Sequence, residues 1–204
     1  MALEGTHIRF ALDMKDKYQV TDLGKYLSGA VYPDSRYTTG VVRAITHPKD
    51  FLNWDVLKLD DFRKGWYVHL LYDKLQSDIM LRDIPQVLEK GSEGLEYWYR
   101  ISAIKTLQDI DDIQKFDLRS YLHYLDYVEN PNGEDIEEVR RYNQNFQKAY
   151  LNPPSIENSI QMWLLLGVSK EREDKVQEWS IIYSQDEKVM QAVRKLYDET
   201  LKIA

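Results

Sequence analysis

The sequence predicts an all-α fold, a multi-helix bundle formed by one domain over residues 1–204. The 204 residues include only nine glycines and six prolines, and so few helix breakers favour long helices over a sheet of many strands. Apolar residues recur at helical spacing through most of the chain. Period-two alternation is lacking, and only Val41-Val42 is a candidate for a short strand. No repeat or Ser/Gly-rich linker divides the chain.

Caps, prolines and apolar periodicity give the expected elements. The first helix is expected to begin at a Thr6 cap, and the second to open at Thr21 and stop before Pro33. The stretch from Pro33 to Val41 is expected to be a loop, and His47-Pro48 to precede another helix start. Further expected elements cover 60–81, a turn region around Pro85 and Gly91, a helix after Gly94, and helices over 118–128, 134–150, 156–166, 170–183 and 186–203.

Charge and cysteine content narrow the classes of function. A net charge of -7 repels phosphate backbones, so we do not expect a nucleic-acid scaffold. The chain has no cysteine, which excludes disulfides, thiolate metal sites and thiol catalysis. No apolar run is long enough for a transmembrane segment. Because Glu4, His7 and Arg9 stand where a signal peptide would be apolar, we expect a cytoplasmic protein.

One pair of residues suggests metal chemistry. His69 and Asp73 are four residues apart in a strongly periodic segment, so they share one face of the expected helix. The apolar neighbours of this pair would bury that face, where an unpaired carboxylate is very costly. A metal cation shared by the two side chains would offset that cost. Two alternatives need no metal. His69 and Asp73 can form a direct hydrogen bond, or Asp73 can face solvent toward Lys74.

Three residues nearer the N-terminus are candidates to join this pair. Asp34 directly follows Pro33 in an expected loop, which a scaffold can aim inward; a turn or cap aspartate is the alternative. His47 stands in Thr46-His47-Pro48, where a helix-entry role is the alternative. His7 has apolar neighbours on the first expected helix, so it can equally be a satisfied core histidine.

Taken in order, these residues resemble the zinc-dependent phospholipase C family, which is related to the single-strand-specific zinc nucleases. The matching features are an early histidine, a Gly-x-x-x-Pro-Asp stretch, a Thr-His pair and a helical His-x-x-x-Asp, which are here His7, Gly29 to Asp34, Thr46-His47 and His69 to Asp73. The match covers residues 5 to about 75. The resemblance implies a helical bundle of the phospholipase C/zinc nuclease type, with a metal cluster between helices.

The resemblance also implies a set of ligands. Asp34, His47, His69 and Asp73 would hold one divalent metal, and His7 would serve a neighbouring metal that shares Asp73. Imidazole and carboxylate ligands suit zinc, with manganese and iron as alternatives. A bound metal lowers the pKa of its water toward about 7 and neutralises charge that develops on a phosphoryl oxygen.

The expected function is therefore a metal-dependent hydrolase, a phosphoesterase that acts with metal-activated water on a small-molecule phosphate ester. Asp34 or Asp73 would act as the base, and we prefer Asp34 because a loop leaves it more room to shift. Arg36 is the candidate to bind the phosphate in a bidentate manner, with a salt bridge as its alternative role. Lys105 is a weaker candidate of the same kind.

The later part of the chain departs from the family. Members with three metals gain ligands from a mature N-terminal amino group and from a later His…His-x-x-x-Glu set. Here only His123 follows, and Tyr127 stands four residues after it in place of glutamate. The departure leaves a second class of function open, a non-catalytic helical interaction or scaffold protein with a structural metal or a vestigial pocket. The helical His-Asp phosphohydrolase fold is not expected, because no His-Asp dipeptide occurs.

Overall fold

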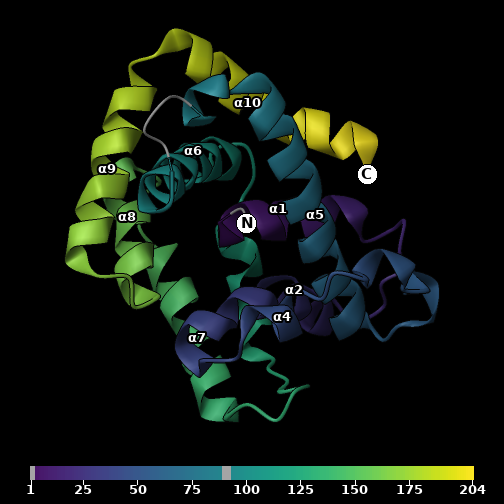
Figure 1. The fold of residues 1–204 in the computed structure, drawn as a ribbon. Coiled ribbons are helices and arrows are strands. Elements are labelled where there is room, and N and C mark those ends of the chain that lie inside the picture. The colour runs from purple at the N-terminus through teal and green to yellow at the C-terminus, as the bar shows by residue number, and fades with distance from the viewer. Residues whose placement is uncertain (1–2, 89–92) are drawn as a thin grey trace.

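The structure is a computed structural model that describes residues 3–88 and 93–204, and within these ranges it is all-helical, as predicted (Figure 1). The expected turn residue Gly91 lies outside the described residues. The α-helices are α1 (Glu4–Met14), α2 (Leu23–Val31), α3 (Arg36–Thr39), α4 (Arg43–Thr46), α5 (Asp61–Asp83), α6 (Leu95–Ile113), α7 (Ile136–Ala149), α8 (Ile156–Leu165), α9 (Lys170–Ser184) and α10 (Glu187–Ile203). Short 3-10 helices are η1 (Tyr32–Ser35), η2 (Phe51–Asn53), η3 (Val56–Lys58), η4 (Pro85–Leu88) and η5 (Leu118–Asp126).

Aspartate caps fix the starts of the two helices that shape the centre of the molecule. Asp60 accepts a hydrogen bond from the Arg63 backbone N–H at 2.9 Å, and α5 begins at the next residue. Asp22 accepts one from the Lys25 backbone N–H at 3.1 Å and caps α2 in the same way. Each side chain satisfies an N–H that the first turn of a helix leaves without a partner.

Two expected caps have other roles. Thr6 lies inside α1, and its hydroxyl donates to the carboxylates of Asp109 and Asp112 on α6. Thr21 precedes the true cap of α2, and its hydroxyl donates to Asp61 at 2.8 Å. Both threonines therefore tie their helices to distant parts of the chain, which a local capping pattern does not reveal.

Several expected segments differ in the structure. The expected loop over 33–41 contains η1 and α3, because a 3-10 turn accommodates Pro33 at its start. His47 follows the short helix α4 instead of preceding a helix. Val41 and Val42 form no strand, since no neighbouring strand is present in the described chain to pair with them. The expected helix over 118–128 is the 3-10 helix η5.

Helices α2 and α5 cross at very short distance because a glycine of each lies at the contact. A Cβ atom on Gly29 would lie 1.9 Å from the Phe62 carbonyl oxygen, and one on Gly65 would lie 1.9 Å from the Tyr26 carbonyl oxygen. No side chain fits in either position. The backbone of α2 therefore reaches the face of α5 that holds His69.

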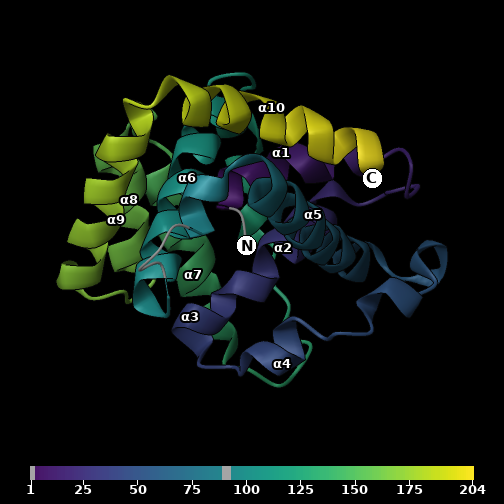
Figure 2. The same ribbon diagram turned by 45° about the horizontal axis from the view of Figure 1, so that its top comes forward.

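The N-terminal helix α1 lies in the middle of the fold. It packs against α2, α5 and α6, and in both ribbon views the other helices surround it, with α8 and α9 on one flank and α10 running across α5 and α6 (Figures 1 and 2). Phe10 on α1 contacts the rings of Tyr72 and Tyr197 in the core. In the part of the chain that is described, no helix combines the length and the apolar character needed to cross a membrane.

The glycine contact predicts a large effect of adding one methyl group. Gly29→Ala should lower the free energy of unfolding by about 3 kcal/mol or more, because the new Cβ forces α2 and α5 apart. Gly24→Ala is the matched control on the same helix, since its Cβ would meet no atom closer than 3.4 Å. This control should be neutral or stabilising by up to about 1 kcal/mol. Urea unfolding measures both, and equal stability of the two variants would contradict the close crossing.

Candidate metal centre

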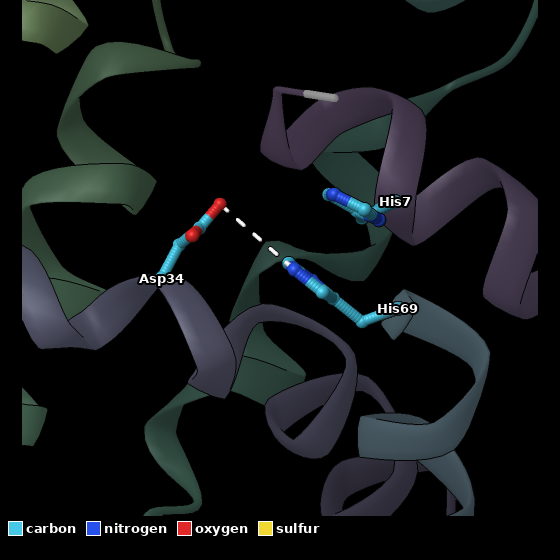
Figure 3. Close-up of side chains that lie close together, drawn as sticks. All are labelled: His7, Asp34 and His69. Atoms are coloured by element: carbon cyan, nitrogen blue, oxygen red, sulfur yellow. Dashed lines mark ion pairs between the residues drawn. The ribbon is translucent and has the colours of Figure 1, made fainter. Parts of the chain in front are cut away.

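Five ionisable side chains from separate segments converge between α1, α2 and α5. His7 comes from the first turns of α1, Asp34 from η1, and His47 from the residue that follows α4. His69 and Asp73 share one face of α5. Figure 3 shows the ring of His7 beside that of His69, with the Asp34 carboxylate pointing toward His69. The five residues expected to bind metal thus lie together in the fold.

The separations between their polar atoms are longer than hydrogen bonds. The Nε2 atoms of His47 and His69 lie 3.5 and 3.7 Å from Oδ2 of Asp73, and Nε2 of His7 lies 3.5 Å from Oδ1 of the same residue. Asp34 lies 3.9 Å from His47 and 4.0 Å from His69. Ligand atoms on a tetrahedral zinc at bond lengths of 2.0–2.2 Å are roughly 3.3–3.6 Å apart. The cluster is therefore spaced as ligands around a cation are spaced, slightly expanded.

His69 is oriented as a metal ligand by the backbone of α2. Its Nδ1 lies 2.8 Å from the Ala30 carbonyl oxygen, which fixes Nδ1 as the protonated nitrogen. The side chain is fully buried, and Nε2 has no hydrogen-bond partner among the described residues. Burial, then the neighbouring His7, hold the pKa of His69 well below its usual value, so the ring is neutral. A buried lone pair of this kind is costly unless an ion or a proton donor meets it.

The other two imidazoles also present nitrogens to the cluster. His47 contacts the Thr46 hydroxyl through Nδ1 at 2.9 Å, which leaves Nε2 toward the carboxylates. His7 is 1% exposed, and neither of its ring nitrogens has a hydrogen-bond partner in the described chain. Its ring stacks on that of His69 with 3.7 Å between centroids. The interpretation of His7 as a satisfied core histidine does not fit this environment.

The two carboxylates of the cluster have opposite electrostatic environments. Burial, then the negative charge of Asp73, raise the pKa of Asp34. Burial acts to raise the pKa of Asp73 as well, yet that pKa is held well below its usual value, and His47, His7 and His69 all act in the lowering direction. Asp73 is therefore the permanent anion of the cluster, and Asp34 is the group whose protonation responds to what is bound.

Within the described residues, two sets of three side chains have ligand atoms close enough to hold one ion. One set is His47, His69 and Asp73, and the other is His7, Asp34 and His69. The buried nitrogens without partners and the nitrogen and oxygen donor set fit zinc or a similar divalent ion. His69 belongs to both sets, whereas the family resemblance implied that Asp73 would be shared.

The cluster opens to solvent on the side of His47 and Asp73. A cavity of about 240 Å³ is lined there by these two residues together with Arg43, Lys49 and Lys74. The remaining members, His7, Asp34 and His69, are almost completely buried. A small anion can thus approach the cluster through this cavity, past cationic side chains.

Of the two roles that the sequence left open for Arg36, the structure bears on the salt bridge. Its Nε lies 3.9 Å from Oδ1 of Asp34, which is a long ion pair, and its guanidinium lies over the ring of Tyr37 at 4.0 Å. In the described part of the chain this Nε donates no hydrogen bond. His123, by contrast, is exposed on η5 and packs on the ring of Tyr124, away from both sets of ligands.

Glu4 is a buried acid next to the site that the sequence analysis did not identify. It lies three residues before His7 on α1, and Oε1 accepts a hydrogen bond from the Tyr142 hydroxyl at 2.6 Å. Oε2 has no partner among the residues that the structure describes. Burial, then the charge of Asp34, raise the pKa of Glu4 to about 8. The i,i+3 spacing to His7 was the one signal that could have indicated its position.

Comparisons of the chain with protein-family models, with curated proteins and with solved structures find no significant match. The resemblance to the phospholipase C family consequently stays a prediction from the ordered motifs. The case for the metal centre is made by the geometry of the five side chains.

We predict that the purified protein binds zinc and that this binding depends on His69. His69→Ala should weaken zinc affinity by more than the 10- to 100-fold that loss of a supporting hydrogen bond typically costs. His123→Ala removes an exposed histidine and should leave affinity unchanged. Calorimetry with zinc measures both, together with the melting temperature, which zinc should raise only where it binds the folded state. Equal affinity of the two variants would contradict the site.

The raised pKa of Glu4 predicts how stability of the metal-free protein changes with pH. The folded chain keeps a proton on Glu4 up to about pH 8, whereas the unfolded chain loses it near 4.5. This contribution to stability is complete below pH 4.5 and is lost as pH rises through about 8. Glu4→Gln should therefore gain stability relative to wild type as pH rises between these values.

Urea midpoints in EDTA at several pH values test this prediction. Glu157→Gln, on the exposed first turn of α8, is the control and should differ from wild type by a constant amount. A constant difference for Glu4→Gln as well would show that Glu4 ionises normally in the folded chain.

Proposed function

We propose that this protein is a metal-dependent phosphoesterase that hydrolyses a small phosphate ester. The observation that supports it best is the set of imidazole nitrogens that have no hydrogen-bond partner among the described residues, which lie close to two carboxylates beside a cavity with cationic walls. Buried polar groups without partners are rare in folded proteins, and they concentrate where a ligand or an ion completes them. Zinc is the metal that we propose, with manganese and iron as alternatives.

A divalent metal held by these residues supplies charge stabilisation at a phosphoryl oxygen and a water of lowered pKa. The protein contributes the acid–base groups. Asp34 is the proposed general base, because burial and the charge of Asp73 raise its pKa above the usual value of a carboxyl and so make it a stronger base. Asp73, whose pKa is held low, stays ionised and fixes the imidazoles around it.

Arg36 is the proposed phosphate-binding residue. Its guanidinium is a planar fork whose paired N–H groups match two oxygens of a phosphate. Stacking on the ring of Tyr37 fixes the orientation of this guanidinium plane. Nε donates to no described residue, so its N–H is available to a phosphate oxygen. Lys49 and Lys74 at the cavity wall add positive charge that draws anions toward the opening.

The order of the motifs adds to this proposal. An early histidine, a Pro-Asp, a Thr-His and a helical His-x-x-x-Asp resemble the zinc-dependent phospholipase C family, whose chemistry is phosphate ester hydrolysis. Cytoplasmic location is part of the same proposal.

A structural metal without catalysis is the competing function, and the depth of the cluster favours it. His7, Asp34 and His69 are each at most 1% exposed, and a buried ion that joins α1, η1 and α5 would stabilise the fold. The two functions separate on metal removal. A structural metal contributes only stability, whereas a catalytic one also supports turnover.

The proposal predicts hydrolysis of mono- or bis-nitrophenyl phosphate by the zinc- or manganese-loaded protein. Asp34→Asn should lower kcat by about 100-fold or more, which is the range of a general base. His69→Ala should abolish turnover together with metal binding, and His123→Ala should leave it intact. Metal that binds and stabilises the fold without any turnover would assign the site a structural role.

A further inference from the structure

A second cavity adjoins the one that opens onto the metal centre. It measures about 370 Å³ and shares Arg43 and Ser77 with the first cavity as common wall residues. Its other cations are Arg36 and Lys105, and its aromatic wall is formed by Trp98 and Trp163, among others. Three cationic side chains thus line one small space on a chain whose net charge is -7.

Lys105 is the unusual member of this set. It lies on α6, outside the segment that carries the family resemblance, and is 8% exposed. No carboxylate of the described residues lies within 4 Å of its ammonium group. Lysine is almost never buried unless it is paired. Burial lowers the pKa of Lys105, and the negative charges of Asp73 and Asp34 oppose this effect from a greater distance.

The two arginines approach the same space from the other side. Arg36 stacks on Tyr37, and its Nε donates no hydrogen bond within the described residues. Arg43 is exposed on α4 at the boundary between the two cavities. A phosphate at the metal centre needs one such cation, so the others exceed what that single group can use.

We propose that the second cavity is an anion subsite in which Lys105 and Arg43 bind a second anionic group of the substrate, next to the Arg36 assigned to the first phosphate. The substrate would then be a diphosphate or a comparable doubly anionic ester, with one phosphoryl group at the metal centre and the other beside Lys105. This inference rests on the proposed function, since it extends the same substrate into the next cavity.

Burial makes such a subsite selective. A charge-assisted hydrogen bond from a partly dehydrated ammonium or guanidinium is stronger than one at an open surface. The aromatic wall of Trp98 and Trp163 excludes water from one side of the cavity. A ligand with a single phosphate leaves this space to water, whereas a ligand with two phosphates fills it.

The test compares two ligands that the protein cannot hydrolyse, inorganic phosphate and methylenediphosphonate. Calorimetry on the metal-loaded protein should give at least about tenfold tighter binding of the diphosphonate, the equivalent of one charge-assisted contact. Lys105→Met keeps the buried aliphatic chain and should remove most of this preference. Arg43→Gln alters an exposed residue that the fold does not need, and should reduce the preference in a folded protein.

Lys74→Gln is the matched control, because Lys74 lines only the metal cavity and pairs with Asp78. It should leave the preference unchanged. Loss of the preference in Lys74→Gln to the same extent as in Lys105→Met would overturn the subsite, because net charge alone would explain it. No preference in wild type would overturn it as well.

A parallel titration in EDTA separates this inference from the proposed function. The lysine and arginine side chains of the second cavity are present in the metal-free protein too, so diphosphonate should still bind it, although more weakly. Lys105→Met should still weaken this binding. If metal and hydrolysis are absent but this binding persists, the phosphoesterase is wrong and the anion site stands. If metal and hydrolysis are present while Lys105→Met has no effect on diphosphonate, the subsite is wrong and the enzyme stands.

Discussion

The close contact between α2 and α5 at Gly29 and Gly65 is the constraint on which the rest of the site depends. Because neither glycine has a side chain, the α2 backbone comes near enough for the Ala30 carbonyl to meet Nδ1 of His69. That one contact sets the tautomer of the buried ring and aims its other nitrogen at the cluster. The same helix continues directly into η1, which contains Pro33 and Asp34. The Asp34 carboxylate thereby comes to lie near His47 and His69.

The buried polar groups of the cluster oppose folding, and the same groups are suited to hold a cation. The cluster combines three imidazoles and two carboxylates within a mostly buried space, and Glu4 adds a third carboxyl nearby. Polar groups buried without partners oppose folding, so the fold gains most where a cation completes them. Helix α1 is anchored for this purpose by Thr6, which donates to Asp109 and Asp112 of α6. His7 therefore reaches the cluster from a helix that is also held to α6 by hydrogen bonds outside the cluster.

The sequence predicted those parts of the fold that local patterns specify. The cap at Asp60 and the apolar periodicity after it located α5 and put His69 and Asp73 on one face, as the structure has them. Breaks at proline and glycine delimited most later helices. Local patterns failed at Thr6, whose hydroxyl is used by residues about a hundred positions away, and at η1, where a 3-10 turn replaces the expected loop.

The members of the cluster were predictable from the sequence, but its surroundings were not. The spacing and order of the histidines and aspartates indicated which side chains meet, because each motif is local and the resemblance supplied the order. Glu4 and the cationic wall around Lys105 come together only through packing of α1 and α6 against the rest. No periodicity or motif marks Glu4. The sequence offered Lys105 as a weaker phosphate-binding candidate, but the pairing of the two cavities had to come from the structure.

Anomalous diffraction from crystals grown with zinc is the most direct measurement of the central claim. Our account predicts a strong peak at the zinc absorption edge about 2.0–2.2 Å from Nε2 of both His47 and His69, with Asp73 as a further ligand. A crystal with zinc bound only at exposed carboxylates, and no peak between these two rings, would contradict it.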